Sequence, residues 1–168
     1  MLFRIITGLV KPTKGEVKVF GETLHKNKSF AGNTSVILEK PGFLEQYNGI
    51  DNLRFLAEIQ MKIGIEKIRE TLKRVGLDPE DKRPVKAYSL GMKQRLAIAQ
   101  AIMEEPQLIL LDEPMNGLDE EAVQNVYNII KEENARGAAI LLTSHHKVDI
   151  ETLCNDVYRV NDGVVSLI

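Results

Sequence analysis

The sequence has 168 residues, of which 43% are hydrophobic and 27% charged, and its net charge at pH 7 is −2. These values fit one folded domain with a sizeable core and give no electrostatic case for binding nucleic acid or an anionic membrane surface. Cys154 is the only cysteine, which excludes an intrachain disulfide and favours a reducing compartment. No apolar run approaches the ~20 residues that cross a bilayer, so we expect a cytoplasmic chain.

The first third of the chain is expected to alternate helix and strand. Residues Leu2 to Leu9 have an amphipathic pattern that predicts a helix, stopped by Pro12 and Gly15. The segment GEVKVFG (15–21) alternates polar and apolar residues, which predicts a half-exposed strand. A short buried strand is predicted over Ser35–Leu38.

The middle of the chain has a different character, because no strand pattern occurs between Phe43 and Leu108. Asp51 is a candidate cap for a helix that runs to about Ile63. A second helix is predicted from apolar residues on one face, namely Ile68, Leu72 and Val75, and it ends at Leu77-Asp78-Pro79.

Strand and helix alternate again after residue 104. The expected elements are strands over Leu108–Leu111 and Ala138–Thr143, helices over Glu120–Asn134 and Lys147–Cys154, and two final strands around Asn161-Asp162-Gly163. Buried strands separated by helices predict an α/β fold with a mostly parallel sheet. We therefore predict an α/β core from residues 1–42 and 104–168, with a helical subdomain over 43–103.

Two carboxylates follow the apolar strand in LILLDEP (108–114). The strand would deliver Asp112 and Glu113 to its carboxyl end, where open α/β sheets bind ligands. One carboxylate could hold Mg²⁺ through its waters, and the other could polarise an attacking water. The alternative is a strand that ends in solvated acids at a turn, and these residues alone do not decide between the two.

Two further segments carry candidate ligand-binding residues. Ser89 and Gly91 lie where a helix should begin, and the free N–H groups of a first turn attract phosphate. His145 follows Ser144 at the end of a strand, where its ring could bond a terminal phosphate or an attacking water. Each segment has a simpler interpretation: Ser89 as a helix cap, Gly91 as a turn glycine, and His145 as a surface residue.

The order of these segments resembles that of the ATP-binding-cassette (ABC) ATPases over essentially all 168 residues. The matching segments are the signature motif at Tyr88–Met92, the Walker B strand at Leu108–Glu113, the D-loop at Gly117-Leu118-Asp119, and the switch histidine at His145. The resemblance implies a fold like that of P-loop NTPases. It also implies an ATP- and Mg²⁺-dependent ATPase in which two nucleotide-binding domains, here a homodimer, sandwich ATP head to tail.

The resemblance also implies roles for individual residues and for partners. Nucleotide contacts are expected from Ser89, Gly91 and Asp119 across the dimer, with Mg²⁺ at Asp112, the general base at Glu113 and a γ-phosphate contact from His145. The helical subdomain would contact a transmembrane permease, so the protein would lie at the inner face of the cell membrane.

The sequence departs from the family pattern at three positions. Leu90 replaces a glycine of the signature and Met92 replaces a glutamine, and the segment SLGMKQR is similar to exporters of the bacitracin and lantibiotic-immunity type. Glu39 stands where the family has its Q-loop glutamine, in a segment, ILEKPGF, that is similar to the same subgroup. We expect Glu39 to approach Mg²⁺ through water.

The phosphate-binding loop of the family, G-x-x-x-x-G-K-[S/T], does not occur in these 168 residues. The segment LFRIITGLVKPTKGEV (2–17) resembles the helix and strand that directly follow that loop. We therefore expect the loop to precede Met1, within a piece of about 40 residues.

Two functional hypotheses follow. The first is an ATP-hydrolysing subunit of an exporter of the antimicrobial-peptide-resistance type, with these 168 residues inactive by themselves. The second is a remnant that pairs with a permease or sister subunit and hydrolyses nothing. A soluble ABC ATPase of repair or translation ranks third, because such proteins usually carry tandem or inserted domains that are not seen here.

Overall fold

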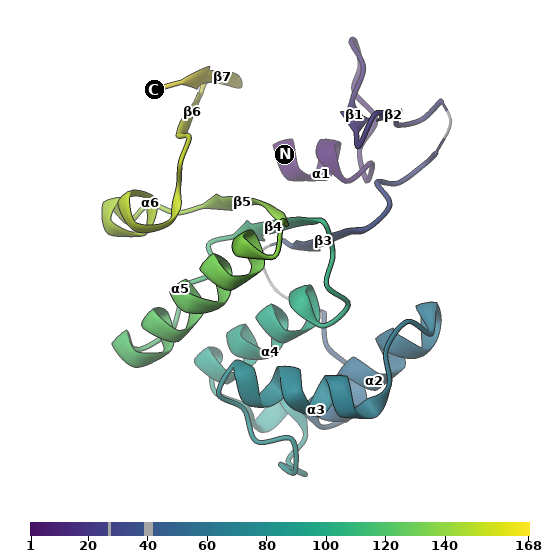
Figure 1. Ribbon diagram of the computed structural model, residues 1–168, viewed down its shortest axis with the longest axis vertical. Coiled ribbons are helices and arrows are strands. Elements are labelled where there is room, and N and C mark those ends of the chain that lie inside the picture. The colour runs from purple at the N-terminus through teal and green to yellow at the C-terminus, as the bar shows by residue number, and fades with distance from the viewer. Residues whose placement is uncertain (27, 39–41) are drawn as a thin grey trace.

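The computed structural model describes residues 1–26, 28–38 and 42–168 (Figure 1). Glu39, the expected Q-loop residue, lies outside the described residues. The helices are α1 (Leu2–Ile6), α2 (Gly49–Gln60), α3 (Ile65–Arg74), the 3-10 helix η1 (Val85–Ala87), α4 (Leu90–Ile102), α5 (Glu120–Ala135) and α6 (Lys147–Leu153). The strands are β1 (Lys18–Val19), β2 (Glu22–Thr23), β3 (Thr34–Ile37), β4 (Leu108–Asp112), β5 (Ala139–Thr143), β6 (Tyr158–Asn161) and β7 (Val164–Leu167).

A parallel sheet with the order β3-β4-β5 lies at the centre of the molecule. The connection from β3 to β4 carries α2, α3 and α4, and α5 connects β4 to β5. Parallel strands require such crossovers, and they cover the sheet with helices. The predicted mixed α/β fold with a parallel sheet is therefore confirmed.

Strand β4 is buried on both faces, as a central parallel strand should be. Leu108 and Leu110 pack with Phe3 of α1, whereas Ile109 and Leu111 join the larger cluster formed with α4 and α5. Figure 1 shows the two layers, with α1 on one side of the sheet and α4 and α5 on the other. Because the apolar run has no polar position before Asp112, both layers can pack against it.

The first helix is shorter than predicted and ends at Ile6 rather than Leu9. Thr7 caps its C-terminus, and its hydroxyl donates to the carbonyl oxygen of Phe3 at 2.9 Å. Gly8 follows with φ +86°, and a Cβ there would lie 2.4 Å from the carbonyl oxygen of Ser29. The close approach of this loop, and not Pro12, therefore ends the helix.

The cap of α2 is also a correction. The side chain of Asn48, not of Asp51, caps the helix by accepting from the Asp51 N–H at 2.9 Å. The helix ends at Gln60 rather than Ile63, because Met61 takes a left-handed conformation with φ 51°. Asp51 is the acidic residue of the first turn, but the cap is the neutral amide that precedes the helix.

The N-terminal strand is reduced to the two residues of β1, which pair antiparallel with β2 outside the parallel sheet.

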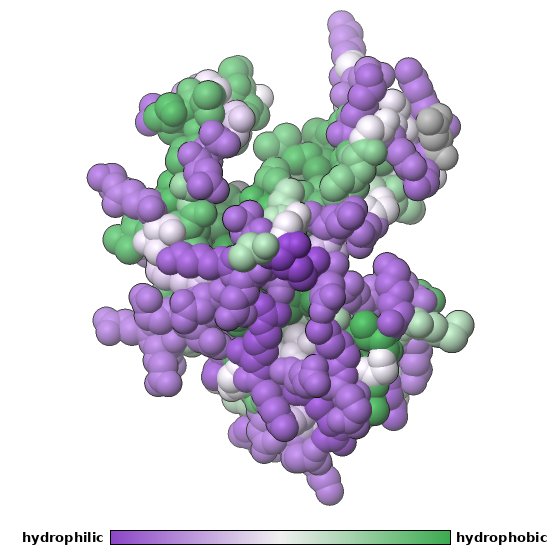
Figure 2. All heavy atoms as spheres, viewed as in Figure 1, coloured by the Kyte–Doolittle hydropathy of each residue, from purple (hydrophilic) through white to green (hydrophobic). Residues whose placement is uncertain are grey.

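The two final strands around the turn at Asp162-Gly163 form the antiparallel hairpin β6–β7, as predicted. All eight hairpin residues are exposed, and Figure 2 shows hydrophobic side chains gathered on this part of the surface at the upper left. Within the described residues, no helix is long and apolar enough to span a bilayer.

Candidate active site

The ends of β4 and β5 bring the predicted carboxylates and the predicted histidine together. The two strands run parallel with Asp112 opposite Thr143, so Glu113 and the residues after Thr143 leave the sheet at the same edge. The Thr143 hydroxyl donates to Oδ1 of Asp112 at 2.6 Å and accepts from the Glu113 N–H at 3.0 Å. One hydroxyl therefore fixes the side chain of Asp112 and the backbone of Glu113.

Glu113 has a left-handed backbone with φ 49°, an uncommon conformation for a residue with a side chain. The turn at Glu113 and Pro114 is held by the buried side chain of Gln94, which comes from α4. Nε2 of Gln94 donates to the carbonyl oxygen of Pro114 at 2.9 Å and also to that of Glu113 at 3.4 Å. Helix α4 therefore supports the turn that presents Glu113.

The side chains of Glu113 and His145 are in direct contact. Nδ1 of His145 lies 2.7 Å from Oε1 of Glu113, with the imidazole exposed and the carboxylate half-buried. We call Asp112, Glu113, Thr143 and His145 the strand-end site. A carboxylate paired with an imidazole is a proton-transfer arrangement, and water can reach both groups.

Residues on both sides of His145 form a hydrogen-bond chain that the sequence reasoning missed. The Ser144 hydroxyl donates to Oδ2 of Asp149 at 2.5 Å, and the Tyr127 hydroxyl donates to Oδ1 of the same carboxylate. Burial raises the pKa of Tyr127 to about 12, and Asp149 adds to the effect. The sequence signal was an acid in the first turn of α6, five residues after Ser144.

Ser89 and Gly91 occupy the start of α4, as predicted. Ser89 is the helix cap, since its hydroxyl accepts from the Met92 N–H at 3.2 Å, so the simpler role is present. A Cβ on Gly91 would lie 2.9 Å from the carbonyl oxygen of Gly117, and a Cβ on Gly117 would lie 2.6 Å from Leu90. The start of α4 and the segment predicted as the D-loop therefore pack closely within one chain.

Asp119 caps α5 by accepting from the Ala122 N–H at 2.9 Å. Asp119 and Ser89 are both exposed, and within the described residues no hydrogen bond or ion pair joins either side chain to the strand-end site.

The surface is hollowed at two places near these residues. A cavity of about 750 Å³ lies between the strand end and the start of α4, lined by residues including Asp112, Glu113, Gln94 and Lys93. Lys93 pairs there with Glu45 at 3.2 Å. This cavity combines polar groups with the paired Glu113, which makes it the candidate active site.

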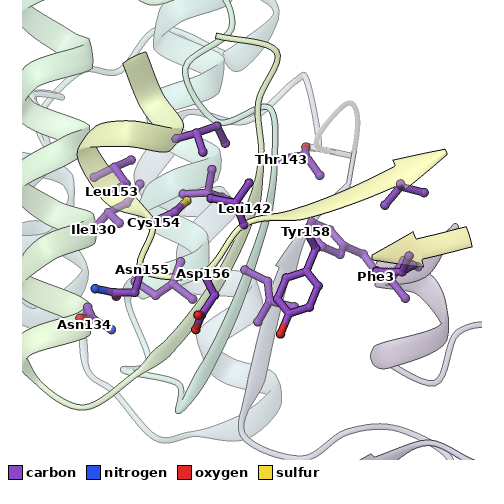
Figure 3. A pocket seen from close by; sticks show the side chains of 17 residues that line it. Phe3, Ile130, Asn134, Leu142, Thr143, Leu153, Cys154, Asn155, Asp156 and Tyr158 are labelled. Atoms are coloured by element: carbon purple, nitrogen blue, oxygen red, sulfur yellow. The ribbon is translucent and has the colours of Figure 1, made fainter. Parts of the chain in front are cut away.

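A second cavity, of about 570 Å³, runs along β5, and we call it the edge groove (Figure 3). Figure 3 shows Leu142, Leu153 and Cys154 on one side of it and Phe3 and Tyr158 on the other. Within the described parts of the chain, β5 pairs with β4 alone, so the groove borders a sheet edge. Its lining is mostly apolar, which suits packing rather than phosphate chemistry.

The residues fit Mg²⁺ only in part. Over residues 1–26, 28–38 and 42–168, no group of three or more His, Cys, Asp or Glu side chains is placed to hold a metal ion. Mg²⁺ usually keeps several waters and binds through one or two carboxylates and the phosphates of its nucleotide. Asp112 meets that requirement as a single carboxylate.

Comparison with known proteins identifies the family. Residues 1–116 match the model of the family described as ABC transporter. The chain belongs to this family. This ABC protein is 44% identical over 163 residues to the ABC transporter ATP-binding protein YybJ of Bacillus subtilis, covering 97% of this chain and 75% of YybJ. The resemblance found in the motifs is therefore confirmed.

Two other relatives carry names that mention transport. The bacitracin transport ATP-binding protein BcrA of Bacillus licheniformis is 40% identical over 95% of this chain and 53% of its own length. The lantibiotic transport ATP-binding protein SrtF of Streptococcus pyogenes is 34% identical over 99% of this chain and 71% of its own length. The chain thus spans about half of BcrA and about three quarters of YybJ.

A solved structure titled "Structure of ATP binding subunit of ABC transporter" superposes on this ABC protein with a TM-score of 0.86. The two sequences are 25% identical, and the match covers 99% of this chain and 72% of the other. The arrangement of strands and helices described above is therefore that of an ABC ATP-binding subunit.

Proposed function

We propose that this ABC protein supplies the hydrolytic half of an ATP site in an exporter of the antimicrobial-peptide-resistance type. The observation that carries the proposal is the contact between Glu113 and His145 at the end of β4, beside Asp112. The bacitracin and lantibiotic transport proteins among the relatives support the cargo class.

Glu113 is the proposed general base. Its carboxylate would accept a proton from the water that attacks the γ-phosphate, and it can do so without moving its backbone, which Thr143 and Gln94 hold. His145 would donate to a γ-phosphate oxygen. Because its ring contacts Glu113 in this structure, the ring would exchange the carboxylate for the phosphate when ATP enters.

Asp112 is the proposed Mg²⁺ residue. When bound, Mg²⁺ would offset the negative charge of the phosphates and of the two carboxylates. Thr143 orients Asp112 by donating to Oδ1 at 2.6 Å. We propose that Glu39 approaches the same ion through water.

We propose that Ser89, Gly91 and Asp119 serve the nucleotide held by a second nucleotide-binding domain. The exposure of Ser89 and Asp119, and the close packing of Gly91 on Gly117, support one continuous surface for head-to-tail pairing. Residues 43–103 would form a helical subdomain that contacts a transmembrane permease. This ABC protein would then lie in the cytoplasm against the inner face of the membrane.

The alternative is a protein that pairs with a permease or sister subunit and hydrolyses nothing. It concerns the 168 residues by themselves, which contain no G-x-x-x-x-G-K-[S/T] segment to hold the phosphates. A soluble ABC ATPase outside transport remains a weaker alternative.

The test uses a fusion that places a glycine–lysine phosphate loop ahead of residue 1. Glu113→Gln keeps the size of the side chain and removes the base, so hydrolysis should fall by about 10²-fold or more while ATP binding is retained. Glu121→Gln, an exposed acid of α5, is the matched control. Normal turnover in the Glu113 variant would show that Glu113 is not the base, and an inactive parent fusion would favour the non-hydrolytic alternative.

A further inference from the structure

Asp149 is a buried carboxylate, only 4% exposed, for which the hydrolytic mechanism has no use. It lies in the first turn of α6. A charge in such a place is costly unless hydrogen bonds compensate it, so its partners indicate what it does. Both of its carboxylate oxygens accept a hydrogen bond, from Tyr127 and from Ser144.

Ser144 relays this contact to the backbone around His145. A hydroxyl can donate one hydrogen bond and accept others, and that of Ser144 does both. It donates to Oδ2 of Asp149 at 2.5 Å and accepts from the His146 N–H at 3.0 Å. The Asp149 N–H donates to the His146 carbonyl oxygen at 3.1 Å. The residues on either side of His145 are thus tied to one carboxylate.

Tyr127 fixes the orientation of that carboxylate from α5. Its side chain is buried, and its hydroxyl, protonated at neutral pH as in any tyrosine, can donate. With Oδ1 engaged by Tyr127, only Oδ2 faces Ser144. The carboxylate therefore has one orientation in which both hydroxyls are satisfied, and that orientation also sets the turn at Ser144.

We propose that Asp149 is a positioning residue, which acts through the Ser144 hydroxyl to hold the ring of His145 against Glu113. Its meaning for hydrolysis rests on the proposed function, but the placement of the ring does not. A merely structural role, in which Asp149 only secures α6 on α5, would leave the His145–Glu113 contact unchanged when Ser144 loses its hydroxyl.

The experiment is histidine-ring NMR on the 168-residue chain at one fixed pH. The sequence has three histidines, His25, His145 and His146, so each ring signal can be assigned from a His→Gln variant. In the parent chain, Glu113→Gln should shift the His145 signal, because the two groups are 2.7 Å apart. That shift measures the contact without requiring ATP.

Ser144→Ala should move the His145 signal to the position it has in Glu113→Gln, and adding Glu113→Gln should then cause no further shift. Ser144→Thr keeps the hydroxyl and should restore the parent signal. Thr152→Val is the matched control, since it removes a hydroxyl that bonds Val148 within the same helix, and it should change nothing at His145.

The proposal is overturned if folded Ser144→Ala keeps the full Glu113-dependent shift, or if Thr152→Val moves the signal equally. Asp149→Asn should act in the same direction as Ser144→Ala. If that variant does not fold, the Ser144 pair carries the test. Loss of the proposed function, seen as normal hydrolysis in Glu113→Gln, would leave this result standing, so the two failures are distinguishable.

Discussion

The two sides of β5 differ in how fully their side chains are paired and packed. On the side of β4, polar groups at the strand ends are paired within the chain, from Thr143 with Asp112 to Gln94 with Pro114. On the other side lie the edge groove and the hairpin β6–β7, where apolar residues such as Val164 and Leu167 are exposed. The comparison shows that the geometry of the strand-end site is set by local contacts, while the apolar surface beside it is only partly packed.

Paired leucine substitutions would give the largest expected contrast between the two sides. Leu96 of α4 is fully buried, whereas Leu167 of β7 is 63% exposed. Leu96→Ala should lower the free energy of unfolding by about 2–5 kcal/mol, and Leu167→Ala by less than about 0.5 kcal/mol. Urea unfolding measures both, and equal losses would mean that the hairpin is packed as tightly as the helices.

The packed side also contains a buried ion-pair cluster between α3 and α5. Glu133 is 2% exposed, and its oxygens lie 2.6 Å from Nη1 of Arg74 and 2.7 Å from Nη2 of Arg136. Both arginines are about one third exposed, so Glu133→Gln should cost about 1–2 kcal/mol, less than for a fully buried pair. Glu132→Gln removes the exposed acid that pairs with the same Arg74 at 2.7 Å, and it should cost less than about 1 kcal/mol. Similar losses of unfolding free energy in the two variants would show that burial does not strengthen the ion pairs of Glu133.

Gly91→Asp should weaken ATP-dependent dimerisation of the phosphate-loop fusion by about tenfold or more, with ATP affinity of the monomer unchanged. The new carboxylate would repel phosphate, and its Cβ would press on the carbonyl oxygen of Gly117. Gly32→Asp is the control, because nothing lies within 4 Å of a Cβ there. Light scattering and calorimetry separate the two effects, and an equal loss of monomer affinity would mean that Gly91 acts within its own chain.

The smallest effect is a change of stability at high pH. The pKa of Tyr127 is raised from 10.0 to about 12, so its protonated form contributes stability that is complete below pH 10 and lost between about pH 10 and pH 12. The parent chain should therefore lose more stability than Tyr127→Phe over that interval. Parallel losses in both chains, measured by urea unfolding, would show that folding does not raise the pKa of Tyr127.

The sequence was sufficient for the parts of the fold that depend on apolar periodicity. The run Leu108–Leu111 predicted a doubly buried strand, and the spacing of Ile68 and Leu72 predicted the buried face of α3, because burial follows such patterns directly. The ends of α1 and α2 were wrong, since they depend on Gly8 meeting Ser29 and on Met61 turning left-handed.

The residues of the candidate site could be predicted from the sequence, but the hydrogen bonds that hold them in place could not. Asp112 ends β4, and Glu113 and His145 follow β4 and β5, so their place at one sheet edge could be predicted from topology. The roles of Gln94 and Asp149 could not be, because a glutamine inside a helix and an acid in a first turn have common solvent-exposed uses. Only the contacts of the folded chain distinguish them.

The central claim is that residues 1–168 hold the hydrolytic groups of an ATP site but not the groups that grip its phosphates. Most of the affinity for a nucleoside triphosphate comes from backbone N–H groups and a lysine around the phosphates, while Asp112 and Glu113 repel them without Mg²⁺. Calorimetric titration of the 168-residue chain with Mg·ATP tests this most directly. We expect a dissociation constant no smaller than about 1 mM, because these residues contain no phosphate-binding loop. A dissociation constant in the micromolar range would show that another segment supplies the phosphate grip, and it would contradict the account.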